Sequence, residues 1–214
     1  DSADSLHLQI EAMKLGFADG RRYVSDPETR DIDPAALLDP AYLAERAELI
    51  DPQKARSQTF GTPGRGDTVY LTVADESGMM ISFIQSNYMG FGSGVVVPDT
   101  GISLQNRGAG FVLQDGHPNQ VGGGKRPYHT IIPAFVTKGG KPVMSFGVMG
   151  GPMQPQGHAQ MMIRMFDYGQ NPQASCDAPR WQVFPGNIVA VEEGVSEDVR
   201  KDLAARGHDV QVAL

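Results

Sequence analysis

The sequence predicts an α+β fold in which a block of strands lies between helical segments. Three observations predict it: helix signals joined by prolines come first, short β-branched runs separated by glycine-containing turns follow, and helix signals return near the C-terminus. With 26 glycines and 15 prolines in 214 residues, the chain favours short elements and many turns. Helices on both sides of a strand block indicate layered α+β packing.

Residues 1–56 are expected to be helical. Apolar residues recur at helical spacing across 5–20, starting with Leu6 and Ile10, and Ser5 stands where an N-cap residue would. Proline starts a helix readily but cannot continue one, so each Asp-Pro pair predicts a short helix after a stiff joint. Such pairs recur at 26–27, 33–34, 39–40 and 51–52.

Residues 57–67 are rich in Gln, Thr, Gly, Pro and Arg and show no periodicity, which predicts a mobile linker. The linker ends at Asp67, directly before a regular strand pattern that begins on Thr68. Two interpretations are open. Asp67 is only the end of a loop, or the chain is cut there so that Thr68 becomes an N-terminus.

Residues 68–214 are expected to hold the strand block and two further helices. Strand patterns occupy 68–74, 80–86, 93–97, 102–105, 131–137 and 143–148, and two more, 188–192 and 209–212, come near the end. Helices are expected at 152–168 and at 196–206, the second capped by Ser196 and ended by Gly207. The apolar stripe of the helix expected at 152–168 should consist of Met161, Met162, Met165 and Phe166.

Composition excludes several classes of partner. A formal net charge of -7 without any basic stretch argues against nucleic acid. No apolar run approaches the roughly 18 residues of a membrane span, so we expect a soluble protein, in a compartment that the sequence does not indicate. Cys176, the only cysteine, has no histidine or lysine beside it and is expected to be an inert thiol. The five histidines lack metal-ligand spacing, so no metal or other cofactor is expected.

Thr68 is the candidate for covalent chemistry. A hydroxyl needs a base to take its proton, and a free α-amine, with an unperturbed pKa of about 7.7 to 8.0, is such a base on the same residue. Cutting before Thr68 would therefore create nucleophile and base together. Left within an uncut chain, Thr68 is only a strand residue.

Three further segments are candidates for a site, each with a plain alternative. Residues 85–94 hold three glycines within five residues, which suits either a close approach to another group or an ordinary hairpin loop, and they lack the Gly-Lys-Ser/Thr ending of a phosphate loop. The Gly150-Gly151 pair leads from a strand into a helix, where backbone amides can stabilise an oxyanion or simply form a turn. Residues 125–130 are polar, as a substrate-binding segment or a loop would be.

These segments occur together, in this order, in the gamma-glutamyltransferase family of N-terminal-nucleophile hydrolases, which the chain resembles throughout. Residues 6–50 resemble the last part of the family's large subunit, and residues 68–214 resemble its whole small subunit. The resemblance implies a four-layer αββα sandwich and self-cleavage between Asp67 and Thr68. It also implies a heterodimer between the small subunit and the remainder of the large subunit.

The resemblance further implies roles for single residues. Thr68 would attack a small-molecule amide to form an acyl-enzyme, Ser86 would hydrogen-bond the nucleophile, and the backbone of Gly150 and Gly151 would form the oxyanion hole. Water or an acceptor amine would then release the acyl group.

The expected substrate-binding residues depart from the family pattern. The well-studied transferases hold the glutamyl ammonium with an aspartate, in whose place this sequence has Gly110, and Arg107 follows Asn106 where they have glutamine. His129 and Thr130 replace paired serines that contact the substrate carboxylate, and Tyr88 replaces an asparagine. A glutaryl-type acyl group, with a carboxylate but no amine, suits Arg107 better than a gamma-glutamyl group. This pattern resembles the cephalosporin acylase-like branch of the family.

The sequence therefore predicts an autoprocessing amide hydrolase or acyltransferase that acts on gamma-glutamyl or glutaryl-type amides. The alternative is a catalytically inactive binding or scaffold protein derived from the family, or an incomplete fragment. It stays open because family members carry a much longer large subunit, including an arginine that grips the substrate carboxylate, and this chain lacks that part.

Overall fold

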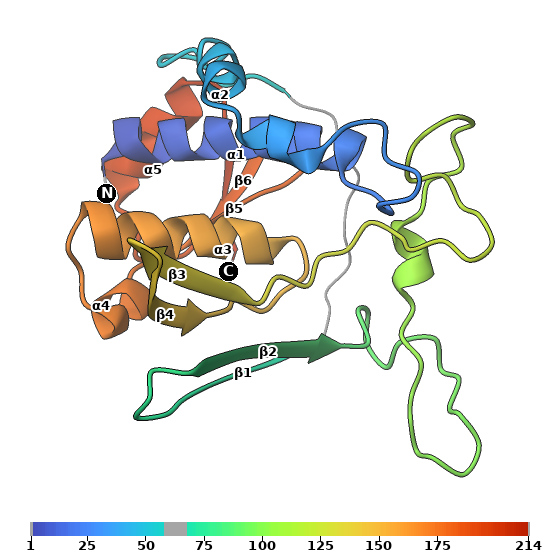
Figure 1. Ribbon diagram of the computed structural model, residues 1–214. Coiled ribbons are helices and arrows are strands. Elements are labelled where there is room, and N and C mark those ends of the chain that lie inside the picture. Colours follow the sequence, from blue (N-terminus) through green and yellow to red (C-terminus); the bar gives the residue numbers. More distant parts are fainter. Residues whose placement is uncertain (1, 58–67, 214) are drawn as a thin grey trace. The chain divides into compact units, whose positions relative to one another are not determined.

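The computed structural model describes residues 2–57 and 68–213, which form two compact units (Figure 1). The first unit holds the described residues up to 57 together with 112–128 and 169–213, and the second holds 68–111 and 129–168. Segments from both sides of the predicted linker therefore share the first unit. The linker itself and its end at Asp67 lie outside the described residues, apart from Ser57. Among the described helices, none has the length and apolarity that a membrane span requires.

The long N-terminal helix and two of the predicted short helices are present. Helix α1 spans Ala3–Tyr23, and its N-cap is Ser2 rather than the expected Ser5, because the Ser2 hydroxyl accepts a hydrogen bond from the Ser5 amide. The 3₁₀ helix η1 (Pro34–Leu38) and helix α2 (Pro40–Ala47) each begin on a proline. Asp33 and Asp39 cap these two helices through their carboxylates, so the pairs at 33–34 and 39–40 act as helix starts, as predicted. The pairs at 26–27 and 51–52 start turns rather than helices, so the prediction was wrong there.

The first unit is built on a three-stranded sheet of β5 (Trp181–Val183), β6 (Ile188–Val191) and β7 (Asp209–Val212). Strand β6 pairs antiparallel with β5 and parallel with β7. Helix α5 (Glu197–Ala205) links β6 to β7, and the Ser196 side chain caps it as predicted. Helix α4 (Pro172–Asp177) and strand β5 were not predicted, since both are too short for a periodic signal.

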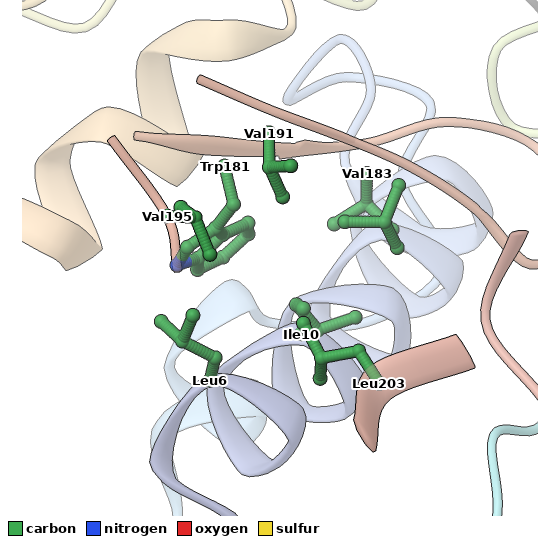
Figure 2. Close-up of a cluster of buried hydrophobic side chains, with 8 residues drawn as sticks. Leu6, Ile10, Trp181, Val183, Val191, Val195 and Leu203 are labelled. Carbon is green, nitrogen blue, oxygen red and sulfur yellow. The ribbon is translucent and has the colours of Figure 1, made fainter. Parts of the chain in front are cut away.

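The hydrophobic core of the first unit joins α1 to this sheet. Leu6 and Ile10 of α1 point toward Trp181 of β5 and Leu203 of α5 (Figure 2). Each of these four side chains is at most 2% exposed. The core therefore combines residues that precede the predicted linker with residues that follow it, and valines at 183, 189, 191 and 195 complete it.

A buried polar network lies on the same helix. Lys14 Nζ donates to Glu11 Oε1 at 2.8 Å and to Asn187 Oδ1 at 3.2 Å, and Lys14 is fully buried. His7 Nδ1 and His208 Nε2 share a hydrogen bond of 2.8 Å. A buried charge requires a hydrogen-bonded partner of opposite sign, and the Glu11 carboxylate supplies it here. Like the core, this network connects α1 to the C-terminal sheet.

The second unit is built from two antiparallel hairpins. Strands β1 (Thr68–Ala74) and β2 (Met80–Ser86) have the predicted bounds, and they pair with Thr68 opposite Ser86. Strands β3 (Ala134–Lys138) and β4 (Lys141–Phe146) form the other hairpin. The Tyr70 hydroxyl bonds Ser82 Oγ, which donates to the Phe146 carbonyl, so one face of the first hairpin lies against β4.

Several predictions of secondary structure in the second unit were wrong. Residues 93–97 and 102–105 are not strands but a loop with a single bridge between Val96 and Ser103. The expected helix 152–168 is α3 (Met153–Met162), followed by a π-helical turn at Ile163–Asp167. The methionine stripe does not form the buried face of this segment, because Phe166 is 53% exposed. The buried residues of α3 are Met153, Gln154, Gln156, Gly157 and Gln160.

The buried network predicts a pH dependence of stability. Burial, followed by the charges of Lys14, His7 and Arg206, lowers the pKa of His208 to about 3. The unfolded chain would bind a proton at about pH 6.5, so protonation favours unfolding and stability falls as pH falls from 6.5 toward 3. The unfolding equilibrium constant should rise by up to about tenfold per pH unit in this window.

Denaturant titrations between pH 5 and 7 measure this slope, since few carboxylates titrate there. His208→Gln removes the titrating group and should flatten the curve, whatever its effect on absolute stability. The Glu11 carboxylate, 4.0 Å from His208 Nε2, is the acidic group of the network. Equal slopes for the two proteins would show that His208 does not stay neutral in the folded state.

Candidate functional site

Thr68 lies at the end of the first hairpin, directly opposite Ser86. In an antiparallel pair, residues opposite one another place their side chains on the same face. Thr68 and Ser86 also line a groove of about 730 Å³ together with Asn87 and Gln105. The structure therefore brings the predicted nucleophile and its predicted hydroxyl partner together at one groove.

The glycine-rich loop that follows Ser86 is held in an irregular conformation. Tyr88 has a φ of 77°, in the left-handed region that few side chains adopt, and its amide donates to Ser86 Oγ at 2.9 Å. Asn106 also stabilises this loop, through hydrogen bonds from its side chain to the loop backbone. Its side chain accepts from the Met89 amide and donates to the Met89 and Gly92 carbonyls. Asn106 thus has a structural role in shaping this wall of the groove.

Arg107 follows Asn106 and starts the 3₁₀ turn η2 (Arg107–Gly110). Its side chain is buried, with 5% of the residue exposed. Nη1 donates to Thr130 Oγ1 at 3.1 Å, and the guanidinium carbon lies 5.1 Å from the centroid of the Tyr88 ring. The structure thus joins three of the predicted substrate-binding residues, Tyr88, Arg107 and Thr130, in one cluster.

His129 precedes Thr130 and lies within the electrostatic influence of the Arg107 guanidinium. Loss of water around the ring, followed by the charge of Arg107, lowers the pKa of His129 below its usual value. Its Nδ1 accepts a hydrogen bond from the Ile131 amide at 3.1 Å. Residues 125–128 of this polar segment belong to the first unit, where Arg126 and Tyr128 bind loop residues through their amides. Only its last two residues, His129 and Thr130, belong to the unit that holds the candidate site.

Gly150 and Gly151 form the predicted turn between β4 and α3. Their φ values are 118° and 57°, a region that glycine adopts at little cost. Both carbonyls accept from the first turn of α3, at Met153 N and Gln154 N. Neither glycine amide has an acceptor within residues 2–57 and 68–213. These two N–H groups are therefore available to a bound oxyanion. No hydrogen bond among the same residues joins this turn to Thr68.

Two residues of α3 that the sequence analysis missed support the turn. His158 Nε2 accepts a hydrogen bond from the Val148 amide at 3.2 Å, and burial lowers the pKa of His158, which keeps this nitrogen unprotonated. Gln154 is fully buried, and its Oε1 accepts from the Ile132 amide at 3.0 Å. A polar face on the first turns of α3 was visible in the sequence, but the methionines beyond it gave the stronger periodic signal.

Among residues 2–57 and 68–213, the first unit brings together a group of metal-ligand type that sequence spacing did not predict. The ligand atoms of His7, Glu11 and His208 lie within 4.8 Å of one another, and all three residues are buried. Lys14 donates to Glu11 and lies 3.5 Å from His208 Nδ1, so an ammonium group already supplies positive charge there. The network therefore has a structural role, tying α1 to the C-terminal sheet. Cys176 is exposed.

Comparison with known proteins identifies relatives along the whole chain. The family model described as gamma-glutamyltranspeptidase matches residues 1–213. The chain is 42% identical to the glutathione hydrolase-like YwrD proenzyme of Bacillus subtilis over 222 residues, covering 99% of this chain and 41% of that protein. It is 44% identical to the oxamate amidohydrolase proenzyme of Klebsiella pneumoniae over 217 residues, with the same coverage.

A solved structure agrees with these relatives. The crystal structure of cephalosporin acylase from Bacillus halodurans is 52% identical, with a TM-score of 0.92, over 100% of this chain and 39% of that one. This likeness confirms the predicted α+β class. The chain spans about two fifths of the length of the curated relatives named above.

The glycine loop offers a test of the groove wall. Gly92 and Gly94 have φ values of 75° and 74°, so alanine at either position costs about 1 kcal/mol of backbone strain. At Gly92 an added Cβ would also collide with the Leu104 carbonyl, whereas at Gly94 nothing lies within 4 Å. Gly92→Ala should therefore destabilise the protein by about 1 to 3 kcal/mol more than Gly94→Ala.

Denaturant unfolding of the two variants measures this difference, and Gly94→Ala serves as the matched control for φ. Equal losses would mean that the Gly92 backbone does not approach Leu104 in solution.

Proposed function

Because the chain belongs to the gamma-glutamyltranspeptidase family, we propose that it forms part of an autoprocessing amide hydrolase or acyltransferase whose nucleophile is Thr68. The observation that carries the proposal is the position of Thr68. It is the first residue of β1, lies opposite Ser86, and lines a groove walled by the glycine loop. The relatives are described as proenzymes and as amide-cleaving enzymes, which supports both parts of the proposal.

Processing would come first. Cleavage between Asp67 and Thr68 would free the Thr68 α-amine, and this amine would take the proton of its own hydroxyl. The hydroxyl oxygen would then form a bond to the substrate carbonyl carbon, and the bond from that carbon to nitrogen would break. The departing amine would receive the proton from the α-amine. Water or an acceptor amine would release the acyl group from the resulting ester.

Other residues would support this reaction. Ser86 would hydrogen-bond the nucleophile, since it shares a hairpin face with Thr68. The amides of Gly150 and Gly151 would stabilise the oxyanion, and their lack of acceptors among the described residues favours this role. Tyr88, Asn106, Arg107, His129 and Thr130 would form the acyl-binding side of the site for gamma-glutamyl or glutaryl-type amides.

The assembly would extend beyond this chain. A four-layer αββα sandwich needs two packed sheets with helices outside each, and the second unit supplies two facing hairpins and α3. The remaining layers and the rest of the large subunit would correspond to the part of the relatives that this chain does not cover. After cleavage the small subunit and the large-subunit remainder would form a heterodimer.

Intact-mass measurement of the purified full-length protein tests the proposal. The wild-type protein should give two polypeptides, the smaller beginning at Thr68, and Thr68→Ala should remain one polypeptide. Thr72→Ala is the matched control on the same strand and should be processed normally. Thr68→Ser keeps the hydroxyl and should also be processed.

Release of p-nitroaniline from gamma-glutamyl and glutaryl anilides tests turnover in the same preparations. Thr68→Ala should reduce it by about a thousandfold or more, because hydroxyl and base are lost together. A wild-type protein that is processed but releases no amine would favour the inactive binding protein. Normal turnover without cleavage, or in Thr68→Ala, would contradict the mechanism.

A further inference from the structure

The segment that connects β4 to the glycine turn is anchored by one side chain of α3. His158 Nε2 accepts a hydrogen bond from the Val148 amide at 3.2 Å, and Val148 lies two residues before Gly150. Among the described residues, this is the only hydrogen bond that residues 147–149 make. The start of the glycine turn is therefore held by His158.

The end of the same turn is held by the helix backbone. The carbonyls of Gly150 and Gly151 accept from the first two amides of α3, at 3.1 and 3.0 Å. Between the two anchors, the glycine φ values are 118° and 57°. Glycine adopts many backbone conformations at similar cost, so this turn keeps one of them only while both of its ends are fixed. The orientation of the two free amides thus depends on His158.

Packing places the His158 ring against the segment that it anchors. The centroid of the Phe146 ring lies 4.7 Å from that of His158, with an angle of 48° between the ring planes. Gly157 allows α3 to come this close, because an added Cβ would lie 2.6 Å from Val148 Cγ1. The donor and the acceptor of the hydrogen bond are therefore both held in place by neighbouring contacts.

The hydrogen bond requires a neutral imidazole. A neutral ring has one acceptor nitrogen, whereas both nitrogens of a protonated ring are donors. Burial lowers the pKa of His158 below its usual value, and no charged group among the described residues contributes to this shift. Tyr70, a titratable residue of β1, lies against Gly147 in the same segment, and its hydroxyl bonds Ser82 Oγ. At neutral pH, His158 therefore serves as an acceptor.

Resting on the function proposed above, we propose that His158 is a positioning residue for the oxyanion site. By accepting from Val148, it keeps the amides of Gly150 and Gly151 in the orientation that the transition state requires. The side chain does not contact the substrate. The oxyanion forms only in the transition state, so loss of this anchor lowers kcat and leaves KM nearly unchanged.

Substitutions test this role in the processed full-length protein, with intact mass giving the amount of free small subunit. His158→Phe keeps a ring and removes the acceptor, and it should lower kcat for glutaryl and gamma-glutamyl anilides by about tenfold to a hundredfold. The KM should change by less than about threefold. His158→Gln restores an acceptor oxygen and should keep kcat within about fivefold of wild type.

Gln160→Met is the matched control for burial. Gln160 is 2% exposed and lies on the same helix, where its amide group donates to the Gln156 carbonyl, so its loss should leave kcat unchanged. An unchanged kcat in His158→Phe would overturn the proposal. Equal losses in His158→Phe and His158→Gln, or an equal loss in Gln160→Met, would assign His158 to the packing of α3 alone.

The acid side of the pH profile gives a second readout, which a role in packing would not move. Below about pH 6.5, wild-type kcat should fall more steeply than that of His158→Gln, because only the imidazole can bind a proton and lose its acceptor. Both proteins retain His208 and the Thr68 amine, so their protonation affects both profiles. Superimposable profiles would refute the requirement for a neutral His158. This comparison also serves if His158→Phe does not fold.

Hydrogen–deuterium exchange separates this proposal from that of the enzyme. In the full-length Thr68→Ala protein, which should neither process nor turn over, peptides covering 147–153 report the protection of the Val148 amide. Adding His158→Phe should speed the exchange of this amide by about tenfold or more, and adding His158→Gln should not. Loss of protection without any wild-type turnover would support the anchor and refute the enzyme. Wild-type turnover with unchanged protection in His158→Phe would refute the anchor alone.

Discussion

The pairing register of β1 with β2 is the constraint on which the candidate site depends. Side chains alternate between the two faces of a strand, so the register decides which groups share a face. With Thr68 opposite Ser86, both hydroxyls lie on the face that also carries Tyr70 and Ser82. A shift of one residue would turn Thr68 to the face of Val69, away from the face that carries Ser86. The bonds from Tyr70 to Ser82 and from Ser82 to the Phe146 carbonyl hold this face against β4.

The same face leads to the second half of the site. Strand β4 ends at Phe146, and the chain then passes Gly147, where an added Cβ would collide with the Tyr70 ring. Because the glycine allows this close approach, the strand that begins with Thr68 packs directly on the segment that enters the Gly150-Gly151 turn. His158 then fixes the Val148 amide, just before the turn. One packing surface thus supports both the candidate nucleophile and the candidate oxyanion donors.

Local signals in the sequence were sufficient for much of the fold. The alternation of 68–74 and 80–86 gave the bounds of β1 and β2, and the Asp-Pro pairs gave the starts of η1 and α2. The same signals failed at 93–97 and 102–105. There the β-branched run pairs with the second segment only through the bridge between Val96 and Ser103, so both segments form a loop. Strand β5 was missed because it has only three residues, of which Trp181 and Val183 are buried by tertiary contacts in the core rather than by a pattern of their own.

In the candidate site, too, some features could be predicted from local sequence patterns and others depend on tertiary contacts. Thr68, the glycine loop and the Gly150-Gly151 turn carry local signatures that a sequence can display. The contact between Arg107 and Thr130 joins two loops and has no periodic signal, so only the structure shows that these predicted residues meet. His158 was missed because its function depends on the Val148 amide, a backbone group that composition does not reveal.

Backbone cleavage before Thr68 would change how the first unit unfolds. Its core and polar network join α1 to β5, β6 and α5, across the segment where the cut would fall. Two polypeptides would then share one hydrophobic interior, and neither could retain its half of that interior alone. Unfolding would become a dissociation, so the midpoint of denaturation of the mature form would rise with protein concentration, whereas that of the uncut precursor would not.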